Sequence, residues 1–247
     1  MGLFKSEKNN NREFSEIVSE LYIEKLSGKE FERFVNVVFS LKDKTPEDMD
    51  YLFSNFLNME IDGLTLPMYV LVNNKDLGFN LSPDQIMSML EKSDLSLSNN
   101  LGWTIPMFLL WYNKSQNLNL STDQIVSVLE KTVMSVQSKD RSWTIPIILL
   151  NDNRNQNLNL SSSQMMSVFE KMDMSLFDNR FITTFFLRLG KQFDLTEDHL
   201  YNVVCLFNTN IKGIDVENQE KISQIMLHNK LFEDTQKGQD LKNTIKL

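Results

Sequence analysis

The sequence predicts an all-α fold, a right-handed stack of about five helix-turn-helix repeats of 35–40 residues with a capping helix at each end. The main observation is a block that returns along the chain, opening at Ser82, Ser121 and Ser161 with steps of 39 and 40 residues. A proline stands 15 residues before each of these serines, at Pro67, Pro106 and Pro146. A repeated unit that cannot bury its own apolar face alone stacks on its neighbours.

The second helix of each unit is predicted from its start signal and its periodicity. Ser82 is a good N-cap, Pro83 suits the first helical position, and Gln85 can reach back to close a capping box. The same pattern opens at Ser121 and Ser161, so we predict helices over 82–93, 121–132 and 161–172. The fourth, seventh and eighth residues after the cap are apolar, which is one face of a helix; they are Ile86, Met89 and Leu90, Ile125, Val128 and Leu129, and Met165, Val168 and Phe169.

The first helix of each unit is shorter and apolar nearly all round. Thr65, Thr104 and Thr144 precede runs of about eight residues that contain a proline near their start. Such a run is enclosed by neighbours, and the threonine is the expected N-cap. The β-branched content leaves a short buried strand as the alternative.

The predicted domain covers 12–232, with its clearest repeats at 64–93, 103–132 and 143–172. Weaker copies open at Thr45 and Thr196. Amphipathic patterns predict helices over 12–26 and 31–41 at one end and over 218–232 at the other. The polar segments 1–11 and 233–247 are expected to be flexible. An Asn or Asp two residues before each opening Ser or Thr is expected to form an Asx-turn; these residues are Asp43, Asn80, Asn119, Asn159 and Asp194.

The stretch LEKSDLSLSNNLGWTIPMFLL resembles an ankyrin repeat, in which a helix ends, a short finger follows and a Thr-Pro-type motif opens the next helix. The copy at 130–150 and the stretch Asp62-Gly63-Leu64-Thr65 are similar, and the resemblance covers about 60–180. It departs from the family in period, because ankyrin units run about 33 residues, and in the complete absence of alanine. A HEAT-like or family-specific two-helix repeat fits the period as well. All three imply a concave surface that binds proteins.

The repeat, the capping boxes and the lack of a catalytic motif favour a non-catalytic interaction scaffold that needs no cofactor. The net charge of −8 disfavours nucleic acid as a partner. The two histidines and the single cysteine, Cys205, form no metal-ligand spacing, and the sequence contains neither a Gly-rich phosphate loop nor a GxSxG or HExxH motif. An enzyme with its active site in the groove is retained as an alternative. We expect a monomer in the cytoplasm.

The partner-binding residues are expected on the loops that precede the first helices. Trp103 and Trp143 stand immediately before the threonine caps, where tryptophan could anchor a partner. Arg141 lies in the loop beside Trp143, and Arg180 occupies a similar place in the next unit. The alternative is that each tryptophan packs on its own helix as a hydrophobic staple, which Leu64 at the same position supports.

The N-terminus carries a lipidation motif. Met1-Gly2-Leu3-Phe4-Lys5-Ser6 matches the myristoylation pattern, with Gly2 as the acceptor. This gives a second alternative, a secreted bacterial effector or adaptor that uses the same scaffold at a membrane of the host cytoplasm. A single acyl chain would hold it only reversibly.

Overall fold

The described part of the chain is mostly helical. The computed structural model describes residues 29, 32–33, 35–36, 46–133, 136–139, 143–153, 155–169 and 171. The expected helix at 12–26, most of that at 31–41, the copy at Thr196, the helix at 218–232 and both flexible ends lie outside this part, as do Gly2, Arg141 and Arg180. The helices with described bounds are α3 (Pro46–Asn55), α4 (Leu66–Asn73), α5 (Pro83–Lys92), α6 (Ile105–Tyr112), α7 (Thr122–Glu130), α8 (Ile145–Asp152) and α9 (Ser162–Phe169).

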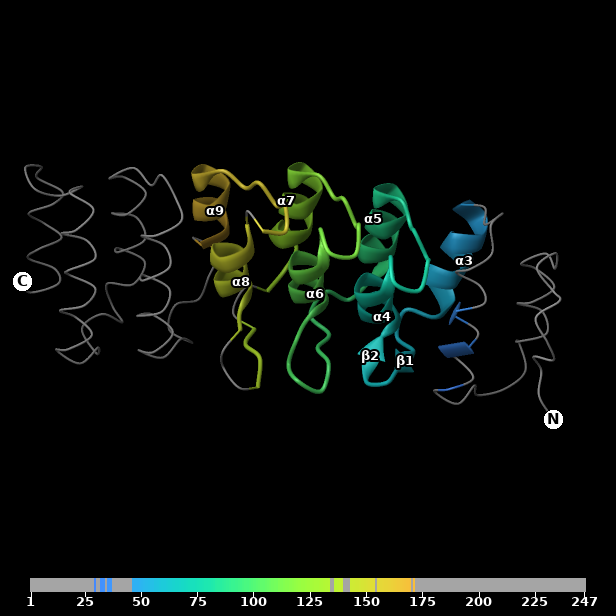
Figure 1. Cartoon of the computed structure of the whole chain (residues 1–247). Coiled ribbons are helices and arrows are strands. Elements are labelled where there is room, and N and C mark those ends of the chain that lie inside the picture. Colours follow the sequence, from blue (N-terminus) through green and yellow to red (C-terminus); the bar gives the residue numbers. More distant parts are fainter. Residues whose placement is uncertain are drawn as a thin grey trace, which may run out of the picture.

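These helices lie in two rows (Figure 1). The first row is formed by α4, α6 and α8, in which α6 contacts both of its neighbours. In the second row α3 packs on α5 and α7 packs on α9. Each of the segments 64–93, 103–132 and 143–172 supplies one helix to each row, which is the two-helix content that the repeat predicted.

The prediction of an all-α fold was wrong at the segments that precede the first row. Strand β1 (Glu60–Ile61) pairs with β2 (Leu64–Thr65) in an antiparallel two-stranded sheet. The turn between them is Asp62-Gly63, with φ of 50° and 78°, and two residues with positive φ match the twist of a tight hairpin. Isolated bridges at the equivalent places join Ser98 to Thr104 and Gln137 to Thr144.

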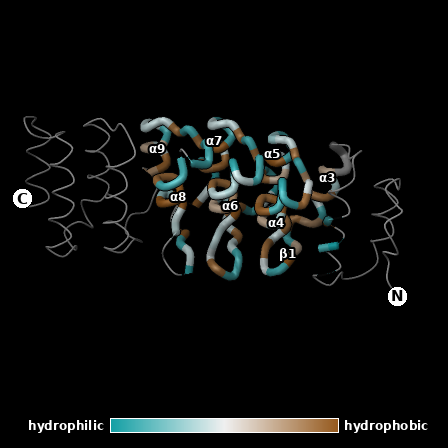
Figure 2. The backbone as a smooth tube through the Cα atoms, in the orientation of Figure 1, coloured by the Kyte–Doolittle hydropathy of each residue, from teal (hydrophilic) through white to brown (hydrophobic). Residues whose placement is uncertain are grey.

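The core lies in and between the two rows. Every apolar position predicted for the second helices is buried in α5, α7 and α9, and so are Met49, Leu52 and Phe53 of α3. The first six residues of each first-row helix are buried, which matches the all-round apolar pattern. Figure 2 shows the hydrophobic residues gathered along α4, α6 and α8. The short buried helix, rather than the alternative buried strand, is therefore correct.

A ladder of asparagine and glutamine side chains joins neighbouring units. Asn74 lies 1% exposed just after α4; its Nδ2 donates to the Gln116 carbonyl at 3.1 Å and its Oδ1 accepts from the Leu81 amide at 2.9 Å. Asn113 repeats both bonds one unit later, to the Gln156 carbonyl and the Leu120 amide. Side chains also cross between units, because Gln116 Oε1 accepts from the Lys75 amide. The ladder fixes the spacing of consecutive helix-helix turns.

Candidate functional site

Three short loops lie side by side at the N-terminal ends of α4, α6 and α8 (Figure 1). We call them fingers: the first spans 60–65, the second spans 98–104, and the third runs between the paired residues Gln137 and Thr144, with 137–139 and 143–144 described. Trp103 ends the second finger and Trp143 ends the third. The two expected tryptophans therefore occupy equivalent places in neighbouring units.

All three tryptophans of the chain meet in one cluster. The ring centroids of Trp103 and Trp111 are 5.5 Å apart, those of Trp111 and Trp143 are 4.8 Å apart, and both pairs meet edge to face. Trp103 and Trp143 complete the triangle at 6.0 Å. Edge-to-face contact of this kind contributes about 0.5–1.5 kcal/mol per pair beyond burial. We call these three residues the tryptophan cluster, and it links the second and third units.

Each ring of the cluster is only partly buried, so the cluster both packs and presents surface. Trp103 directly precedes the Thr104 cap, and its ring centroid lies 5.6 Å from that of Phe108, the fourth residue of α6. This is the geometry of a hydrophobic staple. The packing role that sequence reasoning gave as an alternative is thus present in Trp103. Partner binding by Trp103 and Trp143 stays a prediction.

Sequence reasoning missed Trp111 and Tyr112. Both lie in the last turn of α6 and are half-buried, and Tyr112 stacks on Phe108 with ring centroids 6.1 Å apart. They were read as part of a uniformly buried run. The signal was the polar character of the equivalent residues, Asn73 in α4 and Asn151 and Asp152 in α8, which shows that this turn faces water.

The tip of the second finger is apolar and exposed. Leu101 is 65% exposed, the highest value among the large hydrophobic residues in the described part. Its carbonyl accepts from the Lys139 amide at 2.8 Å, so the second and third fingers touch through their backbones. Gly102 has φ of 80°, and a Cβ there would lie 3.0 Å from the Gln137 oxygen. Glycine permits both the turn and this close approach.

The first unit carries acidic residues at and near its finger. Tyr69 is the fourth residue of α4, the place that Phe108 holds in α6. Burial raises the pKa of its phenol, and the negative charges of Glu32 and Asp62 raise it further. The phenol donates a 3.3 Å hydrogen bond to Asn36 Oδ1. Asp62 is exposed at the first finger, and Glu32 is half-buried. Two carboxylates therefore act on one hydroxyl.

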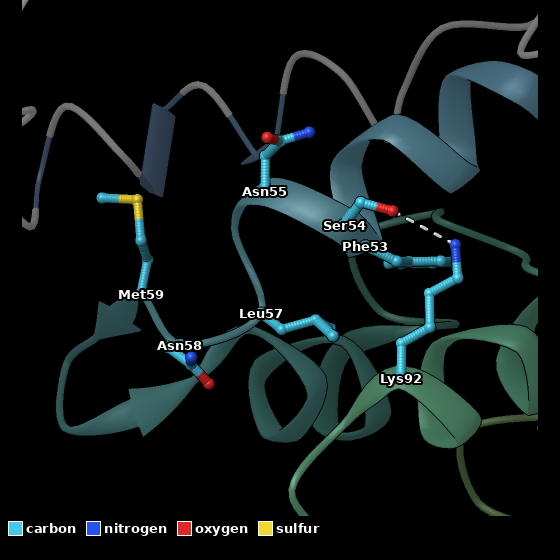
Figure 3. A pocket seen from close by; sticks show the side chains of 7 residues that line it. All are labelled: Phe53, Ser54, Asn55, Leu57, Asn58, Met59 and Lys92. Atoms are coloured by element: carbon cyan, nitrogen blue, oxygen red, sulfur yellow. Dashed lines mark hydrogen bonds between the residues drawn. The ribbon is translucent and has the colours of Figure 1, made fainter.

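A separate cavity of about 490 Å³ lies at the end of α3. Its lining is neutral except for Lys92, whose Nζ donates to Ser54 Oγ at 3.2 Å (Figure 3). Phe53, Leu57 and Met59 supply the apolar part. One ionisable side chain among these lining residues gives no acid-base pair.

Within the described ranges, no group of three or more His, Cys, Asp or Glu residues could hold a metal ion. Among those same residues, none of the helices has the length and apolar character needed to span a bilayer. Comparison of the chain with protein-family models, with curated proteins and with solved structures finds no match.

Proposed function

We propose that this chain is a protein-interaction module built as an α-helical repeat stack, weakly ankyrin-like, with about five units and a capping helix at each end. The two rows of helices, the fingers that precede the first row and the inter-unit ladder support this class. A partner binds on the face formed by the fingers and the first-row helices, which we call the finger face. Trp103 and Trp143 contact the partner, and Trp111 joins them.

The observation that carries the proposal is the partly exposed tryptophan cluster beside the exposed Leu101. Tryptophan is enriched among the residues that dominate binding energy in protein interfaces. Here the anchors are held rigid by edge-to-face contacts. A rigid anchor loses little entropy on binding.

The test compares two leucines of similar chemistry at opposite ends of the first-row helices. Leu101 lies at a finger tip, and Leu77 is 42% exposed in the turn after α4. The full chain is immobilised as the wild type, as Leu101→Glu and as Leu77→Glu, and proteins captured from a lysate are quantified by mass spectrometry. A partner of the finger face is lost with Leu101→Glu by about tenfold or more, which corresponds to about 1.4 kcal/mol, and is retained with Leu77→Glu. Equal capture by the two variants would remove the finger face as the binding site.

A further inference from the structure

We propose that the finger face binds an extended, positively charged segment of a partner protein, with a basic side chain at Asp62 and Glu32 and an arginine or apolar side chain on the tryptophan cluster. This inference rests on the proposed function and adds the chemistry of the partner. It is carried by an aromatic surface with fixed geometry and by the charge beside it.

The charge of the face is uneven. At the first finger, Glu60 and Asp62 are both exposed. Glu32 stands one helical turn before Asn36, whose Oδ1 accepts from the Tyr69 hydroxyl at 3.3 Å, so Glu32 lies on the side of its helix that meets the first unit. At the third finger, the described charged residue is Lys139. A basic side chain is therefore attracted to the first unit, and the chain as a whole adds to that attraction because its net charge is −8.

The tryptophan cluster favours the same partner. Its centroid separations of 4.8–6.0 Å mean that the rings touch one another, so no cation fits between them as it would in an aromatic cage. The outer faces of the rings stay accessible to a partner. An arginine side chain stacks its guanidinium on such a face while its methylene groups cover apolar surface. An acidic side chain finds no such attraction, because the face of an aromatic ring carries negative potential.

The distances suit an extended chain. Neighbouring packed helices stand about 8–10 Å apart, so the path from α4 to α8 measures roughly 16–20 Å. An extended peptide rises about 3.3 Å per residue, so about six residues cover that path. A basic residue at the first finger and an apolar residue about five residues later reach both ends of the face.

The cluster also supplies its own reporter, because it contains every tryptophan of the protein. The full chain is titrated with a synthetic peptide of about eight residues that alternates arginine and phenylalanine, and tryptophan emission is followed. The matched probe is the same peptide with glutamate for arginine. We expect the arginine peptide to shift the emission and to bind about tenfold tighter than the glutamate peptide, with an affinity that falls as salt is raised.

Two double variants distinguish binding at the acidic end of the finger face from attraction by the net charge of the protein. Glu32→Gln with Asp62→Asn removes two of the three carboxylates at the acidic end, and Asp84→Asn with Glu91→Gln removes the same charge from exposed positions on α5. Affinity for the arginine peptide falls about three- to tenfold in the first variant and stays within twofold in the second. Circular dichroism of both variants checks that the helices are retained.

The outcomes distinguish this inference from the proposed function. Equal or tighter binding of the glutamate peptide, with the emission shifted, would overturn the cationic partner and leave the finger face as a binding surface. An equal loss in both double variants would show attraction by net charge only and would also overturn the inference. If neither peptide shifts the emission, the inference is overturned. The proposed function is tested separately, by comparing the partners captured by Leu101→Glu and by Leu77→Glu.

Discussion

Single asparagines decide much of the backbone path between the helices. Asn80, Asn119 and Asn159 stand where the sequence predicted Asx-turns, but their role differs. Their φ angles are 48°, 52° and 53°, and each side-chain Nδ2 donates to the carbonyl two residues earlier. They therefore turn the chain by adopting the left-handed region, which asparagine tolerates better than most residues. The bonds given for them among the described residues are donated by the side chain and not accepted by it.

At this scale the sharpest prediction concerns Asn113, which is 2% exposed and bonds both Gln156 and Leu120. Asn113→Ala leaves a part-buried carbonyl and a buried amide without these partners, so the free energy of unfolding falls by roughly 1–3 kcal/mol. Urea denaturation followed by circular dichroism measures it. The control is Lys114→Ala, because Lys114 joins the ladder only through its backbone amide. A loss below about 0.5 kcal/mol in Asn113→Ala would show that the ladder does not hold the units.

At the scale of the element, the two kinds of helix begin in different ways. Ser82 and Ser121 close complete capping boxes with Gln85 and Gln124, and Ser161 exchanges the same two bonds with Gln164. Thr65, Thr104 and Thr144 occupy the N-cap with extended backbone, as predicted, but only Thr144 accepts a bond through its side chain. The Thr65 and Thr104 hydroxyls are buried without a hydrogen-bond partner among the described residues.

This difference predicts opposite effects for two small changes. Ser121→Ala removes an N-cap and lowers the free energy of unfolding by about 1 kcal/mol. Thr104→Val keeps the shape of the side chain and removes a hydroxyl that has lost water and gained no partner, so the free energy of unfolding rises by about 1 kcal/mol. Both are measured by urea denaturation of the full chain. A Thr104→Val variant as destabilised as Ser121→Ala would show that the hydroxyl is bonded after all.

At the scale of the whole molecule, one continuous core runs through the described units. Buried residues from Val35 to Phe169 form a single cluster. Each unit covers part of its neighbour, because α6 contacts α4 and α8 in the first row, and α3 contacts α5 and α7 contacts α9 in the second. The described units therefore share one hydrophobic core.

Leu129 and Leu101 test this arrangement with the same substitution. Leu129 is fully buried in α7, and Leu129→Ala is expected to lower the free energy of unfolding by about 2–5 kcal/mol. Leu101→Ala, at the exposed finger tip, is expected to change it by no more than about 0.5 kcal/mol. Chemical denaturation gives both values. Similar losses in the two variants would contradict the burial pattern.

Sequence reasoning found part of the candidate site. Trp103 and Trp143 were predicted because they hold equivalent places before a cap, and a repeat makes such places visible along one chain. Trp111 was not, since periodicity showed an apolar run without showing which turn meets water. The acidic end near Tyr69 was also missed, because Glu32 and Tyr69 lie 37 positions apart in sequence and only the fold places the Glu32 charge near the Tyr69 hydroxyl.

The sequence by itself determined where the helices begin, which face of the second helix is buried and how often the unit returns. These properties are local, since capping and helical periodicity act within a few residues. Only the tertiary structure decided that Asn74 bonds a carbonyl 42 residues away, that the first finger closes as two short paired strands and that three tryptophans converge. The asparagine bond and the meeting of the tryptophans join one unit to the next, and no pattern within a single unit specifies them.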